Sequence, residues 1–161
     1  MSKEYCVPKS TARVRLLLVT GESFSFDLYL GRQAESHAGE ERPSDVFNGD
    51  RHFIPLSGPD GRLAIVRRDA VMVASVAAEH ETGPACGELT AARVEVTIEN
   101  GTALRGTVTY MMPEGERRIQ DHLNAPGRFL ALTEGAMVHL INKARIVRLS
   151  AMESAEAAAS R

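Results

Sequence analysis

The stretch RRIQDHLNAPGRFLAL, residues 117–132, has a counterpart in RPSDVFNGDRHFIPL, residues 42–56. Both stretches contain an Arg, an Asp three residues later, an Asn three residues after the Asp, and a Phe five residues after the Asn. The matching pairs are Arg42 with Arg118, Asp45 with Asp121, Asn48 with Asn124, and Phe53 with Phe129. A string that recurs at a long, fixed offset predicts a duplicated structural module.

The duplication extends to both sides of this string. RVRLLLVTGESFSF, starting at residue 13, matches RVEVTIENGTALRG at an offset of 80, and IVRRDAVMV, starting at residue 65, matches LINKARIVR at an offset of 75. The intervening segment contains Gly, Pro and acidic residues without an apolar period, which is typical of a linker. The sequence therefore predicts an N-terminal tail, a first repeat, a linker, a second repeat and a C-terminal tail, at residues 1–11, 12–76, 77–91, 92–149 and 150–161.

Within each repeat the apolar residues alternate with a period of two, which predicts β-strands. In the second repeat Val94, Val96 and Ile98 share one face, and Asn100-Gly101 supplies residues that accept a tight hairpin turn. Gly106 then stands where a missing side chain permits sharp bending. Five short strands per repeat with almost no helix predict an all-β protein of two tandem five-stranded small barrels. We expect the two to pack as a pseudo-dimer through a matching edge or face.

Two blocks of the second repeat resemble those of Sm-like barrels, which belong to the small SH3-like β-barrels. They are NGTALRG, starting at Asn100, and INKARI, starting at Ile141, with an Asp and an Asn between them. The resemblance implies a small barrel, and in that family such positions frame an RNA-binding pocket. In the first repeat, however, Phe26 replaces the glycine and RRDAV replaces NKARI. In the second repeat Asp121 lies fifteen residues after Gly106, whereas the Asp of Sm-like proteins follows the glycine closely, so the resemblance does not carry over the RNA function. The string RxxDxLNxxxxFxxL followed by INK is also similar to that of short bacterial single-module proteins, which implies a fold unit but no activity.

Composition and charge narrow the classes of function. The 161 residues include 19 Lys plus Arg and 21 Asp plus Glu, and a net charge of -2 creates no overall field that would attract a polyanion or an anionic membrane. No apolar run reaches the roughly 18 residues that span a bilayer, so we expect a cytoplasmic protein. Cys6 and Cys86 show no metal-binding spacing, and GxSxG, GxGxxG, P-loop and HExxH motifs are absent. We therefore expect no cofactor, no metal site and no catalytic residue.

The repeated residues suit a structural role. Asp45 and Asp121 are expected to cap a short helical turn while Arg42 and Arg118 pair with them, and Asn48 and Asn124 to close that turn. Phe53 and Phe129 are expected to fill the core at the start of a strand, with a surface anchor for a partner as the alternative. The histidines do not coincide between the repeats, and Val46 stands where His122 would be expected. What repeats is thus suited to building a turn and filling a core.

These patterns predict a non-catalytic interaction or scaffold protein of a bacterial cytoplasmic assembly, with a protein partner. One alternative is an Sm-like RNA-binding protein, in which Arg118, Asn124, Asn142 and Lys143 would contact the nucleic acid. A second alternative is a small-ligand receptor or enzyme with a pocket between the repeats. The sequence leaves open a homo-oligomer. The candidate binding residues are Met111, Met112, Arg117, Arg118, Asn124, Asn142 and Lys143.

Overall fold

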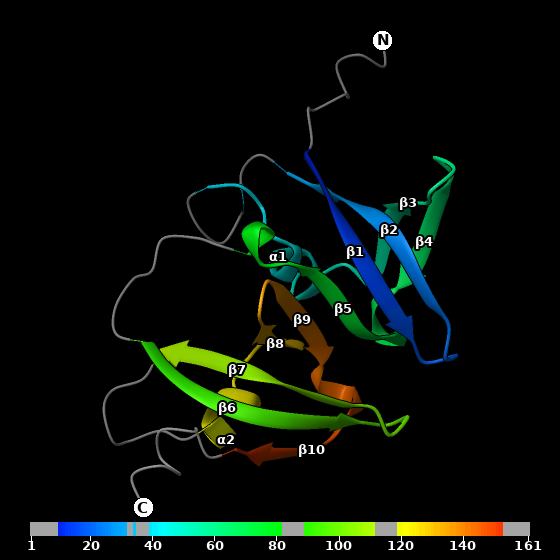
Figure 1. Ribbon diagram of the computed structural model, residues 1–161. Coiled ribbons are helices and arrows are strands. Elements are labelled where there is room, and N and C mark those ends of the chain that lie inside the picture. Colours follow the sequence, from blue (N-terminus) through cyan, green and yellow to red (C-terminus); the bar gives the residue numbers. More distant parts are fainter. Residues whose placement is uncertain (1–9, 32–33, 35–38, 82–88, 112–118, 153–161) are drawn as a thin grey trace, which may run out of the picture.

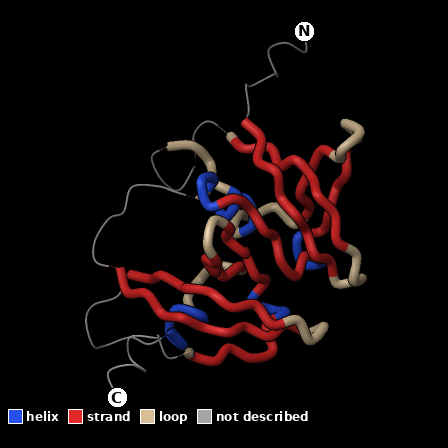
Figure 2. Tube along the Cα trace, viewed as in Figure 1, coloured by secondary structure: helices blue, strands red, loops and turns tan. Residues whose placement is uncertain are grey.

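The computed structural model describes residues 10–31, 34, 39–81, 89–111 and 119–152. Its described part is built almost entirely from strands, with short helices and turns between them (Figure 2). Ten antiparallel strands form one open sheet. The predicted all-β class is confirmed, and closure of each repeat into a small barrel stays a prediction. The two α-helices have five and six residues, and no described helix is long and apolar enough to cross a membrane.

The two repeats place the same kinds of element in the same order. In the first repeat these are β1 (Ser10–Leu18), β2 (Ser23–Leu30), α1 (Pro43–Phe47), β3 (Phe53–Ser57), β4 (Leu63–Arg67), a 3-10 turn (Arg68–Ala70) and β5 (Val71–Ala77). In the second they are β6 (Leu89–Ile98), β7 (Ala103–Met111), α2 (Ile119–Asn124), β8 (Phe129–Glu134), β9 (Met137–Asn142), a 3-10 turn (Lys143–Arg145) and β10 (Ile146–Ala151). A further 3-10 turn, Ala78–His80, follows β5.

The strand order across the sheet is β10-β6-β7-β8-β9-β5-β1-β2-β3-β4. The repeats therefore meet where β5 pairs with β9, near the centre of Figure 1. These are the fifth strand of the first repeat and the fourth strand of the second, so the predicted matching edge is wrong. A two-fold pseudo-dimer would pair equivalent strands, whereas this contact joins unlike ones.

Two apolar clusters form the core, and each includes side chains from both repeats. The first-repeat cluster, built on residues such as Val14, Leu16 and Leu56, also contains Phe129, Val138 and Leu140 of the second repeat. The second-repeat cluster, built on residues such as Val94, Val96 and Leu132, also contains Met72 and Val73 of the first repeat. Because each cluster takes side chains from the other repeat, the contact between the repeats is part of the core itself.

The two repeated phenylalanines differ in their surroundings. Phe129 is buried, as expected of a residue that fills the core, whereas Phe53 is largely exposed. The expectation that Phe53 fills the core is therefore wrong. The physical reason is the asymmetric contact: Phe129 packs into the neighbouring first-repeat cluster, and no described element covers the corresponding place beside Phe53.

Glycine permits two features of the strand pairs. Gly21 and Gly101 have φ near 90° in the turns of the β1-β2 and β6-β7 hairpins, a conformation that side chains disfavour. Gly106 lies in β7, and a Cβ added there would be 2.4 Å from the carbonyl oxygen of Thr133 in β8. The missing side chain thus lets β8 approach the backbone of β7.

We expect Gly106→Ala to destabilise the fold by about 1–3 kcal/mol, the usual cost of overpacking, because the backbone of β8 must move away. Urea unfolding followed by circular dichroism measures this change. Thr109→Ala, an exposed position on the same strand, is the matched control and should change the free energy of unfolding by less than about 1 kcal/mol. Equal effects of the two substitutions would contradict a steric role for Gly106.

Candidate functional site

The seam between the repeats is the pairing of β5 with β9 together with the contacts beside it. The pairing runs from Val73 opposite Ile141 to Ala77 opposite Met137. It is extended by a backbone bond from the Ala78 amide to the Ala136 carbonyl at 2.7 Å.

Asn48 connects the end of α1 with the second repeat. Its side-chain oxygen accepts hydrogen bonds from the backbone amides of Arg128 and Phe129, each at 2.8 Å. These amides lie at the start of β8, so the first-repeat helix turn fixes the position of a second-repeat strand. Asn48 ends α1 in the right-handed region, and only its backbone amide bonds within the turn, to the Ser44 carbonyl. Its side chain bonds across the seam, which the sequence did not predict.

Aromatic packing accompanies this bond. The rings of Phe47 and Phe129 lie with their centroids 5.2 Å apart in a tilted arrangement, a favourable geometry for an aromatic pair. Phe47 is fully buried. In the second repeat Leu123 occupies the position of Phe47, so this aromatic pair is formed only across the seam.

Two further side chains reach across from the second repeat. Asn142 is buried, donates from Nδ2 to the Val71 carbonyl at 3.0 Å, and accepts from the Ala144 amide with Oδ1. Arg145 donates from Nη2 to the Asp69 carbonyl at 3.0 Å and pairs through Nη1 with Glu99 at 3.2 Å. In the face of the sheet, the Ser75 hydroxyl contacts Nδ1 of His139 at 2.7 Å. The seam therefore satisfies polar groups as well as burying apolar ones.

Within each repeat, a basic residue ties the helix turn to the junction between the fourth and fifth strands. The guanidinium of Arg68, which is buried, donates from Nη1 to the Gly49 carbonyl. Lys143, its counterpart, donates from Nζ to the Ala125 carbonyl at 3.1 Å. Burial lowers the pKa of Lys143, and burial together with the nearby charge of Arg128 lowers the pKa of Arg68. Both cations thus serve the internal architecture.

The N-terminus of α1 carries two carboxylates. Asp45 accepts from the Arg42 backbone amide at 2.7 Å, and its carboxylate lies 3.6 Å from Nε of Arg42, which is the arrangement expected from the sequence. Glu81 accepts from the Ser44 amide at 2.8 Å, a contact that the sequence did not indicate because Glu81 follows β5. Burial raises the pKa of Glu81, although its bonds to Ser44 oppose that shift. In the second repeat, Asp121 likewise lies in the first turn of α2.

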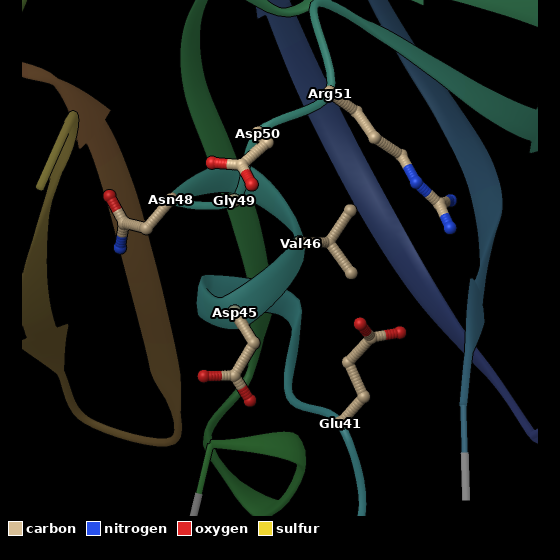
Figure 3. Close-up of a pocket in the computed structure, with 7 residues that line it drawn as sticks. All are labelled: Glu41, Asp45, Val46, Asn48, Gly49, Asp50 and Arg51. Carbon is tan, nitrogen blue, oxygen red and sulfur yellow. The ribbon is translucent and has the colours of Figure 1, made fainter. Parts of the chain in front are cut away.

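A cleft of about 500 Å³ lies beside α1 (Figure 3). Its lining consists of Glu41, Asp45, Val46, Asn48, Gly49, Asp50 and Arg51. Figure 3 shows the Asn48 side chain pointing away from Glu41 and Arg51, consistent with its bonds to the second repeat. The size suits a small ligand. The carboxylate of Asp45 is already engaged in capping the helix, however, and no group activated for nucleophilic attack is among the lining residues.

A smaller hollow of about 170 Å³ lies between the repeats on the face of the sheet. It is lined by Leu17, Val73 and Leu104, with Arg15, Ser23, Ser75, Thr102 and His139 beside them. This volume is below the roughly 300–1,000 Å³ of typical ligand pockets. In the described ranges, no three His, Cys, Asp or Glu side chains lie close enough together to hold a metal ion.

The candidate binding residues that the structure describes differ in their surroundings. Asn142 is buried and Lys143 is bonded to the α2 turn, whereas Asn124 is exposed at the end of α2. Met111 ends β7, opposite Leu89. Arg117, Arg118 and Met112 lie outside the described residues, as do most of the two loops that precede the helices.

The sequence did not reveal the residues that form the seam. Asn48 and Phe129 were singled out as repeated residues, but their mutual contact depends on which edges pair. Ser75 gave no signal in a single sequence, and Phe47 and Arg145 are not among the residues that are identical in both repeats. The deviations between the repeats were the available signal, since Phe47 opposite Leu123 and Arg145 opposite Ala70 are differences at positions now seen at the seam.

Comparison with known proteins gives no relative: no family model matches the chain, and no curated protein or solved structure shows significant similarity to it.

Asn48→Ala is expected to destabilise the chain by about 2 kcal/mol, because two amides at the start of β8 lose their acceptor. Urea unfolding at submicromolar protein concentration measures the effect. The matched control is Asn124→Ala, which removes the repeat counterpart at an exposed position and should cost less than about 0.5 kcal/mol. Similar losses for both substitutions would show that Asn48 acts only within its own turn.

His122 should make stability depend on pH. It stacks on Tyr110 with ring centroids 5.3 Å apart, and burial, followed by the charge of Lys143, lowers its pKa. With the folded pKa below the value of about 6.5 in the unfolded chain, the unfolded state binds the proton more readily. Stability from this group is thus present above about pH 6.5 and is lost as pH falls through the folded pKa.

His122→Gln removes this titration and should flatten the fall in unfolding free energy between about pH 7 and pH 5. Urea midpoints measured at several pH values test it. His80→Gln serves as the control, and an unchanged pH profile in the His122 variant would refute the assignment.

Proposed function

We propose that this chain is a non-catalytic interaction or scaffold protein of a bacterial cytoplasmic assembly, built from two tandem small barrels of the Sm-like or SH3-like kind. The observation that supports it is the exposed apolar edge at β4. This strand ends the sheet order, so within the described residues it pairs only with β3, and its Leu63 and Ile65 side chains are exposed.

An exposed apolar edge strand favours pairing with another chain. Its unpaired amides and carbonyls can bond an added strand, and natural proteins usually protect such edges with charge, proline or a covering element. Arg62 precedes β4 and Arg67 ends it, but its other four residues, Leu63 to Val66, are apolar. Strand addition supplies main-chain bonds, and the exposed side chains supply apolar contact area.

The alternatives have less support from the described contacts. Lys143 and Asn142, two residues assigned to RNA in the Sm-like alternative, are used in bonds within the protein. The receptor or enzyme alternative requires a pocket between the repeats, but the cleft beside α1 lies in the first repeat. The hollow that does lie between them, about 170 Å³, is smaller than typical ligand pockets. We therefore prefer the protein-interaction function.

The test places a photoreactive benzoylphenylalanine at Ile65 in the full chain, expressed in its native cells. Irradiation should give a covalent adduct with a protein at Ile65 and at most a trace with the same probe at Val19. Val19 is an exposed apolar residue at the β1-β2 turn, away from the β4 edge, and so is the matched control. Absence of a protein adduct at Ile65 would overturn the proposed function, and a nuclease-sensitive adduct would favour the RNA alternative instead.

A further inference from the structure

Each half of the seam has an unused counterpart at an opposite end of the sheet. The seam joins β5 to β9, and the repeat counterparts of these strands are β10 and β4. β10 and β4 are the two ends of the strand order. One chain therefore carries a second copy of both surfaces that meet in its own seam, and these two surfaces do not meet each other within the chain.

The repeat relation predicts how the two ends would pair. At the seam the opposed pairs are Val73 with Ile141, Ala74 with Leu140, Ser75 with His139 and Val76 with Val138. In this part of the chain, matched residues of the two repeats differ by 75 in number, so each residue is replaced by its counterpart in the other repeat. The pairs expected between β10 and β4 are then Arg148 with Val66, Leu149 with Ile65, Ser150 with Ala64 and Ala151 with Leu63. All of these residues lie within β10 or β4. The edges thus have matching length and a defined antiparallel register.

The exposed fractions of matched side chains differ between the seam and the free β4 edge. Phe129, Val138 and Leu140, which the second repeat inserts into the first-repeat cluster, are 5%, 5% and 0% exposed. Their first-repeat counterparts Phe53, Leu63 and Ile65 are 58%, 65% and 61% exposed.

The reverse contribution shows the same contrast. Met72, which the first repeat inserts into the second-repeat cluster, is 2% exposed, and its counterpart Val147 is 67% exposed. Both residues interrupt the strand register in the same way: Met72 lies where β5 shifts against β1, and Val147 where β10 shifts against β6. The bulge that directs Met72 into the neighbouring cluster is therefore also present at β10.

The end of α2 supplies further side chains for the contact between β10 and β4. Asn124, the counterpart of Asn48, is exposed. The amides of Arg128 and Phe129, which donate to Asn48 at the seam, correspond to those of His52 and Phe53. Leu123, the counterpart of Phe47, is partly buried next to the second-repeat cluster. An incoming Phe53 would therefore lie against Leu123 as Phe129 lies against Phe47.

We infer that the chain associates head to tail with a second copy of itself, with β10 of one copy pairing with β4 of the next in this register. The inference rests on the proposed function and names the partner for the β4 edge. Since the contact is heterologous, each added copy presents the same two ends again. The product is a ring if the rotation between copies closes and a filament if it does not.

The contact between copies lacks part of the bonding of the seam. Ala70 stands where Arg145 stands, so the bond to the Asp69 carbonyl has no equivalent. Leu123 replaces Phe47, so the aromatic pair is missing as well. We therefore expect association that depends on protein concentration.

The test uses two single-cysteine variants of the full chain, Ala64→Cys and Ser150→Cys, each with Cys6→Ser and Cys86→Ser. Ser75 and His139 contact each other at the seam, so their counterparts Ser150 and Ala64 should face each other between copies. Opposed residues in an antiparallel pair have Cα atoms about 4.5–5.5 Å apart, within the range that a disulfide spans. Mixing the two variants under mild oxidation should give the mixed disulfide as the main product.

Control variants test the register of the β10-β4 pairing and the involvement of the β4 surface. When Leu149→Cys replaces Ser150→Cys, the cysteine lies on the other face of β10, and it should crosslink to Ala64→Cys much less. Adding Ile65→Asp should weaken the association at least about tenfold in sedimentation velocity, because a carboxylate would be buried, whereas Val19→Asp should leave it unchanged. Ile65 is exposed, so this variant is expected to fold, and circular dichroism verifies it.

Two results would overturn the inference. One is a protein that stays monomeric up to about 100 μM and gives no mixed disulfide. The other is Ala64→Cys crosslinking to itself as readily as to Ser150→Cys, which would show symmetrical pairing of two β4 strands. In either case an in-cell adduct at Ile65 with a different protein would leave the proposed function standing, so the two failures are distinguishable.

Discussion

The pairing of β5 with β9 joins two unlike edges, and this single constraint decides where most other features of the protein lie. Because the fifth strand of one repeat meets the fourth strand of the other, the chain can hold two repeats in a continuous sheet and still leave one edge of each kind unused. A contact between like edges would have left two equal ends. The asymmetry explains why Phe129, Val138 and Leu140 are buried, whereas their apolar counterparts Phe53, Leu63 and Ile65 are exposed.

Several residues have diverged in the way that this constraint requires. Arg145 and Phe47 strengthen the seam from opposite sides, and their counterparts Ala70 and Leu123 cannot make the same contacts. Arg68 and Lys143, by contrast, keep a cation in both repeats, since each ties a helix turn to the strand junction within its own repeat. A cation that serves each repeat is thus kept in both, whereas Arg145 and Phe47, which contribute to the seam, have no equivalent in the other repeat.

Local features of the fold were accessible from the sequence because local interactions decide them. The alternation of Val94, Val96 and Ile98 predicted a buried strand face, and Gly21 and Gly101 take the positive φ that a hairpin turn uses. Asp45 caps its short helix through a bond to a residue three positions away. The exposure of Phe53 and the role of Asn48 were not accessible, since both depend on which edges meet. Identical residue types at matched positions carry no information on that choice.

The β5-β9 seam lies within one chain, whereas the β10-β4 contact would join two chains. This difference explains why the two contacts, made by equivalent strands, can differ in strength. Because both repeats belong to one chain, their effective concentration is in the millimolar range or above, so pairing at the seam loses little translational freedom. Pairing of β10 with β4 between copies must offset the loss of translational and rotational freedom of a whole molecule. The apolar side chains at this edge, Leu63 and Ile65, are suited to that task, because apolar burial does not require the precise bonding geometry that Arg145 and Asn142 provide at the seam. The exposed edge is therefore expected to stay uncovered in dilute solution and to be covered by another copy as the protein concentration rises.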